Sequence, residues 1–546
     1  MKQGHALFVR QFWPVPLLLA LLLLPFGCSQ KQKTVPPPPV AGAGMELVLL
    51  HTNDTHSHLA GIDKYGNPCF EDSQCRGGMA RIAAAIRARK AQSDNVLALD
   101  AGDFFQGTLF YSVHKWPVIA AVNAHMPYDA MTLGNHEFDD GCDALKKFLE
   151  KTTFPVVGAN LKPQPGCPLR NSTIENWIIR QVRGTSVGIV GLANDEVRHL
   201  ASACEHTTFD AAATALRRAV QELQARNVSH IVALTHLGLP ADRELARTVD
   251  GVDVIIGGHT HSYLGPDSRE GPYPLVEKSP SGKPVLVVTA KNATQYLGDL
   301  TVVFDREGVP LRWSGGAREL MPEDPGDPVI RKIINSYTGS LESFRKTKIG
   351  SHNLQYADGM DACRAGDCLS GMLFVDALLE YARPFGATLA LANGGTIRSA
   401  LAPGDITRSD LMTLIPFRNI MELRRYTGAQ LLQALEHGVA EEGGKGPRLL
   451  QTAGLRYTVD ASRPTGQRVV SAETLDEKGN AEPIDRAKTY TAILANYLTR
   501  GGDGYGVLAQ GEAISFSNPT DVEVLEAYVK KHSPLPMPTA GRITFR

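Results

Sequence analysis

Residues 46–58, ELVLLHTNDTHSH, decide the fold, because an apolar run ending at Leu50 passes directly into a polar segment that contains Asp54 and His56. A short apolar run of this kind predicts a buried strand. The pattern recurs in NVLALD at 95–100 before AGDFFQG, DAMTL at 129–133 before GNHEFD, HIVAL at 230–234 before THLG, and VDVII at 252–256 before GGHTHS. Open α/β sheets place their chemistry beyond the carboxyl ends of the strands. These junctions therefore predict one shared site at a sheet edge.

Side chains at these junctions suit a pair of divalent cations: Asp54, His56, Asp103, Asn135, His236, His259 and His261. Two ions a few ångströms apart need a shared anionic bridge, and Asp103 is the natural one. Asp54, His56 and His261 would complete one ion; Asn135, His236 and His259 would complete the other. Any one of these residues alone would more often cap a loop or fill a core, but the whole set favours metal binding. Ligands without thiolate indicate Zn, Mn, Co or Fe, with Zn or Mn preferred.

His136 lies beside the expected ligand Asn135 but is expected to have a catalytic role. Asp139, three residues later, could hold its imidazole and favour the protonated form beside a phosphate. Other histidines lack such neighbours and are expected to be structural or solvated: His5, His114, His125, His206, His230, His352 and His437.

The length of 546 residues predicts two domains. Residues 45–322 alternate apolar runs with helical stretches at 78–91 and 211–225, which predicts a layered α/β domain. Residues 323–349 form an expected linker helix, capped by Asp327-Pro328, with an apolar stripe from Ile330 to Phe344. Residues 350–546 predict a second α/β domain with strands at TLALAN, NIMELRR, LRYTV and TYTAILAN.

The N-terminus predicts export. Lys2 and Arg10 precede an apolar stretch at 15–26, and Gly27-Cys28 follows, so residues 1–28 resemble a signal peptide with Cys28 as an acylated first residue. Pro25 departs from the usual lipoprotein pattern, and simple cleavage is the alternative. Residues 29–44 form an expected proline-rich tether. We expect a periplasmic or cell-surface protein attached to a membrane only through lipid, and a net charge of -1 does not favour nucleic acid as a partner.

Eight cysteines suit an oxidising compartment. Cys69 with Cys75, and Cys363 with Cys368, could each close a small loop, and neither spacing is that of a CxxC zinc site. If Cys28 is acylated, Cys142, Cys167 and Cys204 remain. A bridge between Cys167 and Cys204 is one expectation; buried thiols are an equal alternative.

The segments D-x-H, G-D, G-N-H-E-F-D, the lone His236 and G-G-H-T-H resemble those of the calcineurin-like metallophosphoesterases. With the second domain included, residues 46–546 resemble the 5'-nucleotidase family, whose members include ecto-5'-nucleotidases and bacterial periplasmic UDP-sugar hydrolases. The resemblance implies an α/β/β/α metallophosphoesterase domain, a linking helix and a C-terminal nucleotide-binding domain that rotates about the linker to gate turnover.

Arginine suits phosphate because its planar fork matches two oxygens at once. The resemblance implies that Arg364 and Arg398 contact the phosphate and that Asn393 lies at the nucleoside. It also implies that Phe417 and Tyr497 stack on the base and that Asp503 accepts from ribose hydroxyls. Tyr497 stands where animal members of the family have Phe, and core packing is the alternative for both aromatics.

The function that the resemblance implies is a secreted dimetal 5'-nucleotidase. Its ions would acidify a water, and the resulting hydroxide would attack phosphorus in line with the leaving ribose oxygen. The same architecture serves UDP-sugar and NAD pyrophosphatases, 2',3'-cyclic phosphodiesterases and, least compatibly here, thiosulfohydrolases. A non-catalytic nucleotide-binding surface lipoprotein is an alternative of another class, which the intact ligand set disfavours. The sequence specifies neither base preference nor oligomeric state.

Overall fold

The computed structural model describes residues 43–64, 68–70, 74–195, 206–476, 478–516 and 519–546. The expected signal peptide, the acylated Cys28, the tether up to residue 42 and Cys204 lie outside these ranges. Among the described residues, no helix has the length and apolar character that a membrane crossing requires.

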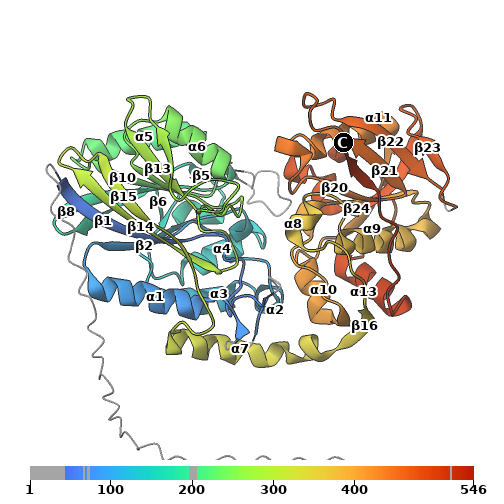
Figure 1. Ribbon diagram of the computed structural model, residues 1–546, viewed down its shortest axis with the longest axis horizontal. Helices are drawn as coiled ribbons and strands as arrows, with labels where there is room; N and C mark the ends of the chain where they lie inside the picture. Colours follow the sequence, from blue (N-terminus) through green and yellow to red (C-terminus); the bar gives the residue numbers. More distant parts are fainter. Residues whose placement is uncertain (1–42, 65–67, 71–73, 196–205, 477, 517–518) are drawn as a thin grey trace, which may run out of the picture. The chain divides into compact units, whose positions relative to one another are not determined.

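The N-terminal domain is built on two stacked sheets (Figure 1). The seven-stranded sheet has the order β15 (Pro310–Glu319), β14 (Tyr296–Asp305), β1 (Ala43–Thr52), β2 (Val96–Asp100), β3 (Ala130–Thr132), β4 (Val156–Val157) and β6 (Ile174–Glu175). The six-stranded sheet has the order β12 (Leu275–Lys278), β13 (Pro284–Val288), β11 (Val254–Ile256), β10 (His230–Thr235), β8 (Thr185–Leu192) and β7 (Trp177–Val182). The apolar runs at 46–50, 95–100, 129–133, 230–234 and 252–256 thus supply β1, β2, β3, β10 and β11, as predicted.

Side-chain alternation explains why these strands are apolar throughout. Leu47 and Leu49 of β1 enter the core between the two sheets, whereas Val48 and Leu50 enter the core beneath the helices. Both faces of such a strand are buried, so neither face needs polar residues. The pairs β1–β2, β2–β3, β8–β10 and β10–β11 are parallel, which brings their carboxyl ends to a common edge within each sheet.

Helices cover the outer face of each sheet, which gives the predicted α/β/β/α layers (Figure 1). One helical layer comprises α1 (Met79–Gln92), α2 (Leu109–His114), α3 (Trp116–Asn123) and α4 (Cys142–Leu149). The other comprises α5 (Ala212–Gln224) and α6 (Leu239–Thr248). The predicted helices at 78–91 and 211–225 are confirmed as α1 and α5.

Helix α7 (Pro328–Lys346) follows the N-terminal domain. Its cap is the predicted one, because the Asp327 carboxylate accepts from the backbone N–H groups of Val329 and Ile330 at 3.0 Å each. Ile330, Ile334 and Leu341 are buried in the same core as α1 and α2. The apolar stripe therefore attaches the helix to the N-terminal domain.

The C-terminal domain contains a five-stranded sheet ordered β20 (Leu450–Ala453), β17 (Leu389–Asn393), β24 (Thr489–Ala495), β19 (Met421–Thr427) and β25 (Glu512–Ile514). A four-stranded sheet is ordered β23 (Ala481–Pro483), β22 (Val469–Leu475), β21 (Leu455–Val459) and β26 (Ile543–Phe545), and β16 (Lys348–His352) pairs with β18 (Gly404–Thr407). The helices are α8 (Met360–Cys363), α9 (Leu369–Ala382), α10 (Arg408–Leu414), α11 (Gly428–Gly438), α12 (Asn496–Thr499) and α13 (Asp521–Lys531). The four strands predicted here correspond to β17, β19, β21 and β24.

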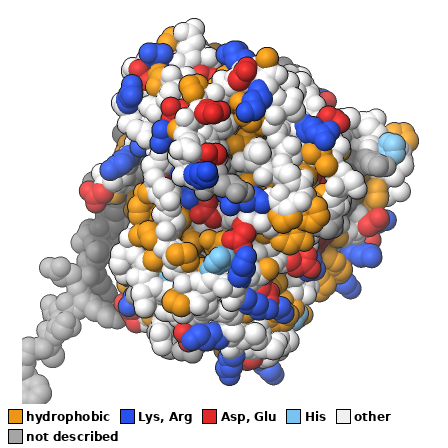
Figure 2. All heavy atoms as spheres, turned by 90° about the vertical axis from the view of Figure 1, so that its right-hand side faces the viewer, with side chains coloured by type: hydrophobic (Ala, Val, Ile, Leu, Met, Phe, Trp, Pro, Cys, Tyr) orange, Lys and Arg blue, Asp and Glu red, His pale blue; other side chains and the backbone are white. Residues whose placement is uncertain are grey.

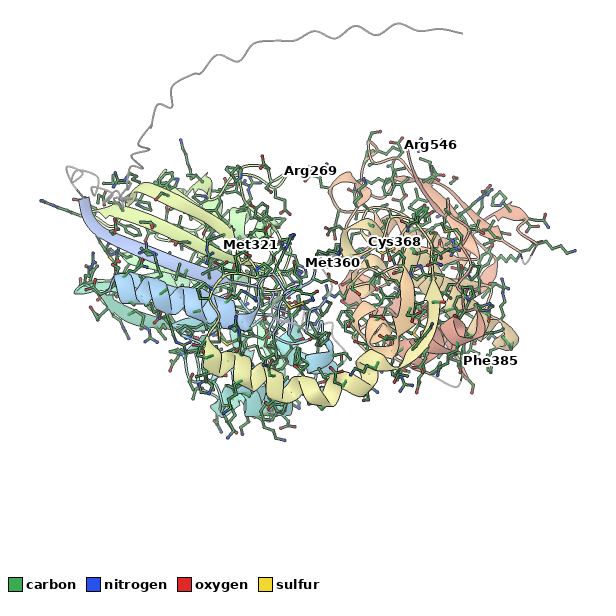
Figure 3. The ribbon with its side chains drawn as sticks, turned by 60° about the horizontal axis from the view of Figure 1, so that its bottom comes forward. Arg269, Met321, Met360, Cys368, Phe385 and Arg546 are labelled. Atoms are coloured by element: carbon green, nitrogen blue, oxygen red, sulfur yellow. A yellow bond between two sulfur atoms is a disulfide. The ribbon has the colours of Figure 1, made fainter. Side chains whose placement is uncertain are left out.

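Two predicted disulfides are present, Cys69–Cys75 and Cys363–Cys368 (Figure 3, where Cys368 is labelled). The expected bridge between Cys167 and Cys204 is wrong. Cys167 carries a free, buried thiol, whereas Cys142 is disulfide-bonded. Cys142 and Cys167 lie 4.0 Å apart between sulfurs, so sequence spacing could not tell which of them is bonded.

Acidic and basic side chains are interspersed on the molecular face shown in Figure 2. That mixture fits the net charge of -1.

Candidate functional site

The site begins where the parallel strands of the N-terminal domain end. Asp54 and His56 follow β1, Asp103 follows β2, and Asn135 and His136 follow β3. His236 follows β10, and His259 and His261 follow β11. Five of the seven expected ligands have a left-handed backbone, with φ of 49° at Asp54, 45° at His56, 62° at Asp103, 77° at His259 and 56° at His261. Non-glycine residues in this conformation are uncommon and cluster at functional sites.

Asp54, His56 and His261 form the first group of converging ligand atoms. The Nε2 atoms of His56 and His261 lie 2.9 Å apart, and His261 Nε2 lies 3.4 Å from Asp54 Oδ1. His56 Nδ1 lies 3.2 Å from the carbonyl oxygen of Phe105, to which it donates, so its Nε2 carries a free lone pair. Imidazole nitrogens that face each other beside a carboxylate oxygen match the donor set of a bound cation.

Asp103, His236 and His259 form the second group. His236 Nδ1 donates to the carbonyl oxygen of Ala101 at 2.5 Å, and its Nε2 lies 3.0 Å from Asp103 Oδ2. His259 Nδ1 lies 3.1 Å from Asn135 Oδ1. The structure thus gathers the expected ligands of the second ion around one carboxylate.

Asp103 touches both groups. Its Oδ2 lies 3.0 Å from His236 Nε2 and 3.8 Å from His56 Nε2, which is the position that a bridging ligand needs. Asp54 Oδ1 also reaches the second group, at 3.6 Å from His236 Nε2. The two carboxylates therefore lie between two sets of imidazoles.

The charges within this cluster favour a cation. Burial lowers the pKa of His56 and of His261 well below the ordinary value, which keeps both imidazoles neutral, as metal ligands must be. Burial would lower the pKa of His236 too, but Asp103 and Asp54 outweigh it and raise that pKa to about 10. The pKa of Asp103 is held well below its usual range, because His236 and its neighbours outweigh the burial that would raise it.

The position of Asp103 explains why the segment GNHEFD begins with a glycine, Gly134. A Cβ atom at this position would lie 2.0 Å from Asp103 Oδ1, closer than any side chain can approach a carboxylate. Residue 134 must therefore lack a side chain so that the Asp103 carboxylate can reach the centre of the cluster.

His136 is oriented on both sides of its ring. Its Nδ1 lies 2.8 Å from Asp139 Oδ2, and its Nε2 lies 3.1 Å from Nη2 of Arg398. Because an arginine N–H can only donate, the second contact requires a neutral imidazole with its proton on Nδ1. Burial and Arg398 lower the pKa of His136, but Asp139 and Asp103 outweigh them and raise it. The two carboxylates therefore favour a proton on this ring, whereas Arg398 opposes it.

The two arginines of the C-terminal domain are half-buried and lie close enough for each charge to act on the other. Burial and the charge of Arg398 lower the pKa of Arg364 to about 10, and Nε of Arg364 is buried with no hydrogen-bond partner in the described part of the chain. Burial likewise lowers the pKa of Arg398. Two close cations with an unused buried donor form a site for an anion. The Cys363–Cys368 disulfide brackets Arg364, as the sequence suggested.

Phe417 lies against the groups expected at the phosphate. Its ring stacks on the imidazole of His136, with centroids 5.7 Å apart, and the guanidinium of Arg398 lies 5.1 Å from its centre. Tyr497, Asp503 and Asn393 form a separate hydrogen-bonded group. Asp503 is close enough to both arginines for its charge to oppose part of the lowering of their pKa by burial. The expected phosphate and nucleoside groups are thus neighbours.

Three supporting residues lie outside the predicted site. The Glu137 carboxylate accepts from the backbone N–H groups of Asp103 at 3.0 Å and Gly134 at 2.7 Å, and so ties two ligand loops together. Asn53 donates to Asp54 Oδ2 at 2.6 Å. His437, expected to be merely structural, donates from Nε2 to the carbonyl oxygen of Asp503 at 2.8 Å. Glu137 and Asn53 adjoin ligands in the sequence, which is a usable signal, whereas nothing in the sequence marks His437.

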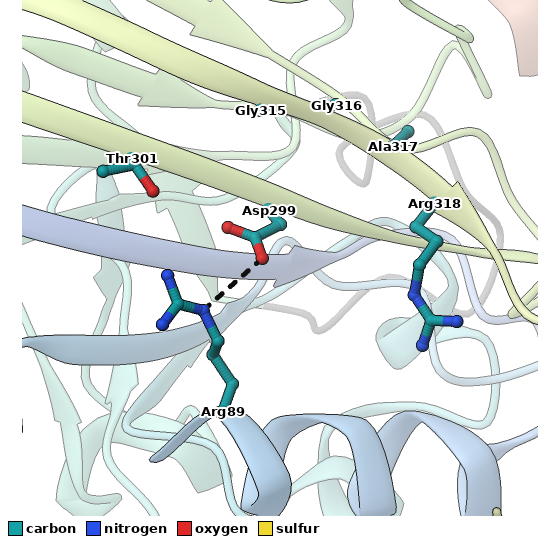
Figure 4. A pocket seen from close by; sticks show the side chains of 7 residues that line it. All are labelled: Arg89, Asp299, Thr301, Gly315, Gly316, Ala317 and Arg318. Atoms are coloured by element: carbon teal, nitrogen blue, oxygen red, sulfur yellow. Dashed lines mark ion pairs between the residues drawn. The ribbon is translucent and has the colours of Figure 1, made fainter. Parts of the chain in front are cut away.

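A hollow of about 510 Å³ lies elsewhere, over β14 and β15 (Figure 4). Two arginines line it, but each has a carboxylate partner. Arg89 Nε lies 3.7 Å from Asp299 Oδ2, and Arg318 Nη1 lies 3.1 Å from Asp324 Oδ2. This hollow lacks the converging imidazoles of the ligand cluster, so it is not a second candidate for the chemistry.

Comparisons with known proteins cover nearly the whole chain. Residues 47–263 match the family model for calcineurin-like phosphoesterases, and residues 348–510 match the 5'-nucleotidase C-terminal domain. The chain is 34% identical to a 5'-nucleotidase of Homo sapiens over 93% of its own length and 92% of that protein.

Solved structures give the same result. A 5'-nucleotidase precursor from Thermus thermophilus superposes with a TM-score of 0.85 at 35% identity, over 92% of this chain and 99% of that one. The NAD nucleotidase of Haemophilus influenzae gives a TM-score of 0.54 at 26% identity, over 92% of this chain and 99% of that one.

Proposed function

Because this chain belongs to the 5'-nucleotidase family and is a hydrolase that acts on nucleotides, we propose that it converts nucleoside 5'-monophosphates to nucleoside and phosphate. The observation that carries this proposal is the contact between His136 of the metallophosphoesterase domain and Arg398 of the C-terminal domain, at 3.1 Å. It joins the ligand cluster to the half-buried pair Arg364 and Arg398. A phosphate bound between the ligand cluster and the two arginines would contact both groups.

The family uses a dimetal centre, and the residues present fit one. Asp54, His56 and His261 would hold one ion; Asn135, His236 and His259 would hold the other, with Asp103 shared. Zn²⁺ or Mn²⁺ suits this donor set of imidazole, carboxylate and amide. When bound, such an ion pair supplies positive charge and an acidified water for attack on phosphorus.

The remaining side chains act on the phosphate itself. Arg364 and Arg398 would donate to the non-bridging oxygens, and their paired charges would neutralise the charge that accumulates there. As Arg398 turns to the phosphate, Nε2 of His136 becomes free to hold a proton. Asp139 keeps the other ring nitrogen in place, so that this proton points at the transferring group or the departing ribose oxygen. Phe417 and Tyr497 would contact the base, while Asn393 and Asp503 would contact the ribose.

The preferred substrate is tested by measuring product release from AMP, UDP-glucose, NAD and 2',3'-cyclic AMP, with and without chelator. We expect AMP to be hydrolysed fastest, and activity to be lost on chelation and restored by Zn²⁺ or Mn²⁺. Faster cleavage of UDP-glucose or NAD would assign the chain to the pyrophosphatase activity of the same fold. Nucleotide binding without turnover under every metal would make it a non-catalytic binding protein.

We also propose export and attachment through lipid on Cys28. The two small disulfides fit an oxidising compartment. Cell fractionation with labelled palmitate tests this, since Cys28→Ser should abolish the label. A label that persists in this variant would remove Cys28 as the anchor.

A further inference from the structure

Asp503 is held by hydrogen bonds on both its backbone and its side chain. Tyr497 Oη donates to Asp503 Oδ1 at 2.6 Å and accepts from the Asp503 backbone N–H at 3.0 Å. Asn393 Nδ2 donates to Asp503 Oδ2 at 2.6 Å, and His437 Nε2 donates to the Asp503 carbonyl oxygen at 2.8 Å. One tyrosine hydroxyl therefore supplies two of these contacts.

The backbone of Asp503 needs this support. It has φ of 53° and ψ of 21°, a left-handed conformation that a non-glycine residue rarely adopts. Such a conformation persists only where the surroundings over-determine it. The reciprocal pair with Tyr497 closes a small ring that fixes the backbone and the carboxylate together.

The partners of Asp503 are themselves fixed. Thr396 Oγ1 donates to Asn393 Oδ1 at 2.6 Å, which sets the direction of the Asn393 amide. Gly502 lies over the ring of Tyr497, because a Cβ atom there would be 2.5 to 2.6 Å from three of the ring carbons. The ring is therefore covered on that side by the Gly501–Gly504 turn.

The shape of a carboxylate matches that of a vicinal diol, because its two oxygens can accept from two adjacent hydroxyl donors at once. Each carboxylate oxygen accepts at about two lone-pair positions, so one oxygen can receive a protein donor and a ligand donor together. Tyr497 donates to Oδ1 of Asp503 and Asn393 donates to Oδ2. With one protein donor directed at each oxygen, the plane of the carboxylate is set before a ligand arrives.

We propose that the Tyr497 hydroxyl is a positioning group that fixes Asp503 for the two hydroxyls of ribose and makes the pocket select ribose over a sugar that lacks both hydroxyls. This inference rests on the proposed function, since it takes a nucleoside as the ligand. The tyrosine ring keeps its contact with the base, and the hydroxyl adds sugar discrimination that a phenylalanine in its place would not supply.

The test compares the wild type with Tyr497→Phe, which keeps the ring and removes both contacts to Asp503. Calorimetry would measure the Kd for adenosine and for 2',3'-dideoxyadenosine, and kinetics would measure KM and kcat for the matching 5'-monophosphates. We expect Tyr497→Phe to weaken the binding of adenosine about tenfold more than the binding of dideoxyadenosine. The loss should appear in KM more than in kcat. Tyr497→Leu, which also removes the ring, should weaken the binding of both nucleosides.

Equal weakening of the two nucleosides by Tyr497→Phe, or no weakening, would overturn the inference. The wild type alone provides a second measurement that needs no variant, since equal affinity for adenosine and dideoxyadenosine would also overturn it. The two proposals fail separately. Ribose-selective binding without AMP hydrolysis would remove the proposed function and keep this inference; hydrolysis without ribose selectivity would do the reverse.

Discussion

His136 Nε2 lies 3.1 Å from Nη2 of Arg398, although 262 residues separate them in the chain. The contact links the loop after β3 with the loop after β17. Each residue also has a neighbour that suits it to act on a phosphate. Asp139 holds the ring of His136, and Arg364 adds a second positive charge beside Arg398. A proton donor and an anion site are thus held together by one hydrogen bond that the substrate would replace.

Replacing His136 with alanine should remove most turnover and leave the ligand cluster intact. A positioned acid–base group typically contributes 10²- to 10⁴-fold to a rate, so we expect a fall in kcat of about that size. Metal content measured by elemental analysis should stay at the wild-type level, because His136 lies outside both proposed ligand sets. Asp139→Asn should cause a smaller fall, since the ring loses its partner but remains. Near-normal phosphate release by His136→Ala would remove this residue from the chemistry.

Activity should fall even when Arg364 is replaced by lysine, which keeps the positive charge. Its buried Nε has no hydrogen-bond partner among the described residues, and lysine cannot place a second donor there. We expect Arg364→Lys to reduce kcat/KM by roughly 10- to 100-fold, with the loss mainly in KM. The matched control is Arg425→Lys on β19, where an exposed arginine pairs with Glu512 and should tolerate the change. Equal, small effects of the two substitutions would argue against an anion site at Arg364.

Most of the fold could be predicted from local sequence. The runs that became β1, β2, β3, β10 and β11 are apolar on both faces, and their length and the polar residues after them mark the sheet edge. The cap at Asp327 is equally local. These features depend on side-chain periodicity and on neighbours in the chain, which is what a single sequence records.

The finer features of the site depend on contacts between distant segments. Stacking of Phe417 on His136 and the contact of His437 with Asp503 join residues far apart in the chain, and no spacing rule relates them. The bonding state of Cys167 likewise depends on which of two neighbouring sulfurs is aligned for a bond. A sequence pattern nominates residue types, whereas these pairings are decided by how the loops fold over the sheet edges.

Gly134→Ala should weaken metal binding. The new Cβ would lie 2.0 Å from Asp103 Oδ1, so the shared carboxylate must move. We expect the affinity for Zn²⁺ or Mn²⁺, measured by competition with a chromophoric chelator, to fall about tenfold or more. Gly316→Ala on β15 is the matched control, because a Cβ there meets nothing within 4 Å. Unchanged affinity in Gly134→Ala would show that Asp103 is not needed in its observed position.

Asp521 should make stability depend on pH. Burial raises its pKa to about 7, even though the carboxylate accepts from the backbone N–H groups of Asn419 at 2.9 Å and Val522 at 2.7 Å. A carboxyl with a raised pKa in the folded state binds its proton more tightly there than in the unfolded chain. Its contribution to stability is fully present below about pH 4 and is lost as the pH rises through 7.

The comparison that isolates this effect is wild type against Asp521→Asn, which cannot titrate. We expect the Tm of the wild type to fall relative to that of the variant by a few degrees between pH 5 and pH 8. Changes in metal occupancy with pH affect both proteins alike and cancel in the difference. Parallel Tm curves for the two proteins would show that Asp521 has an ordinary pKa in the folded state.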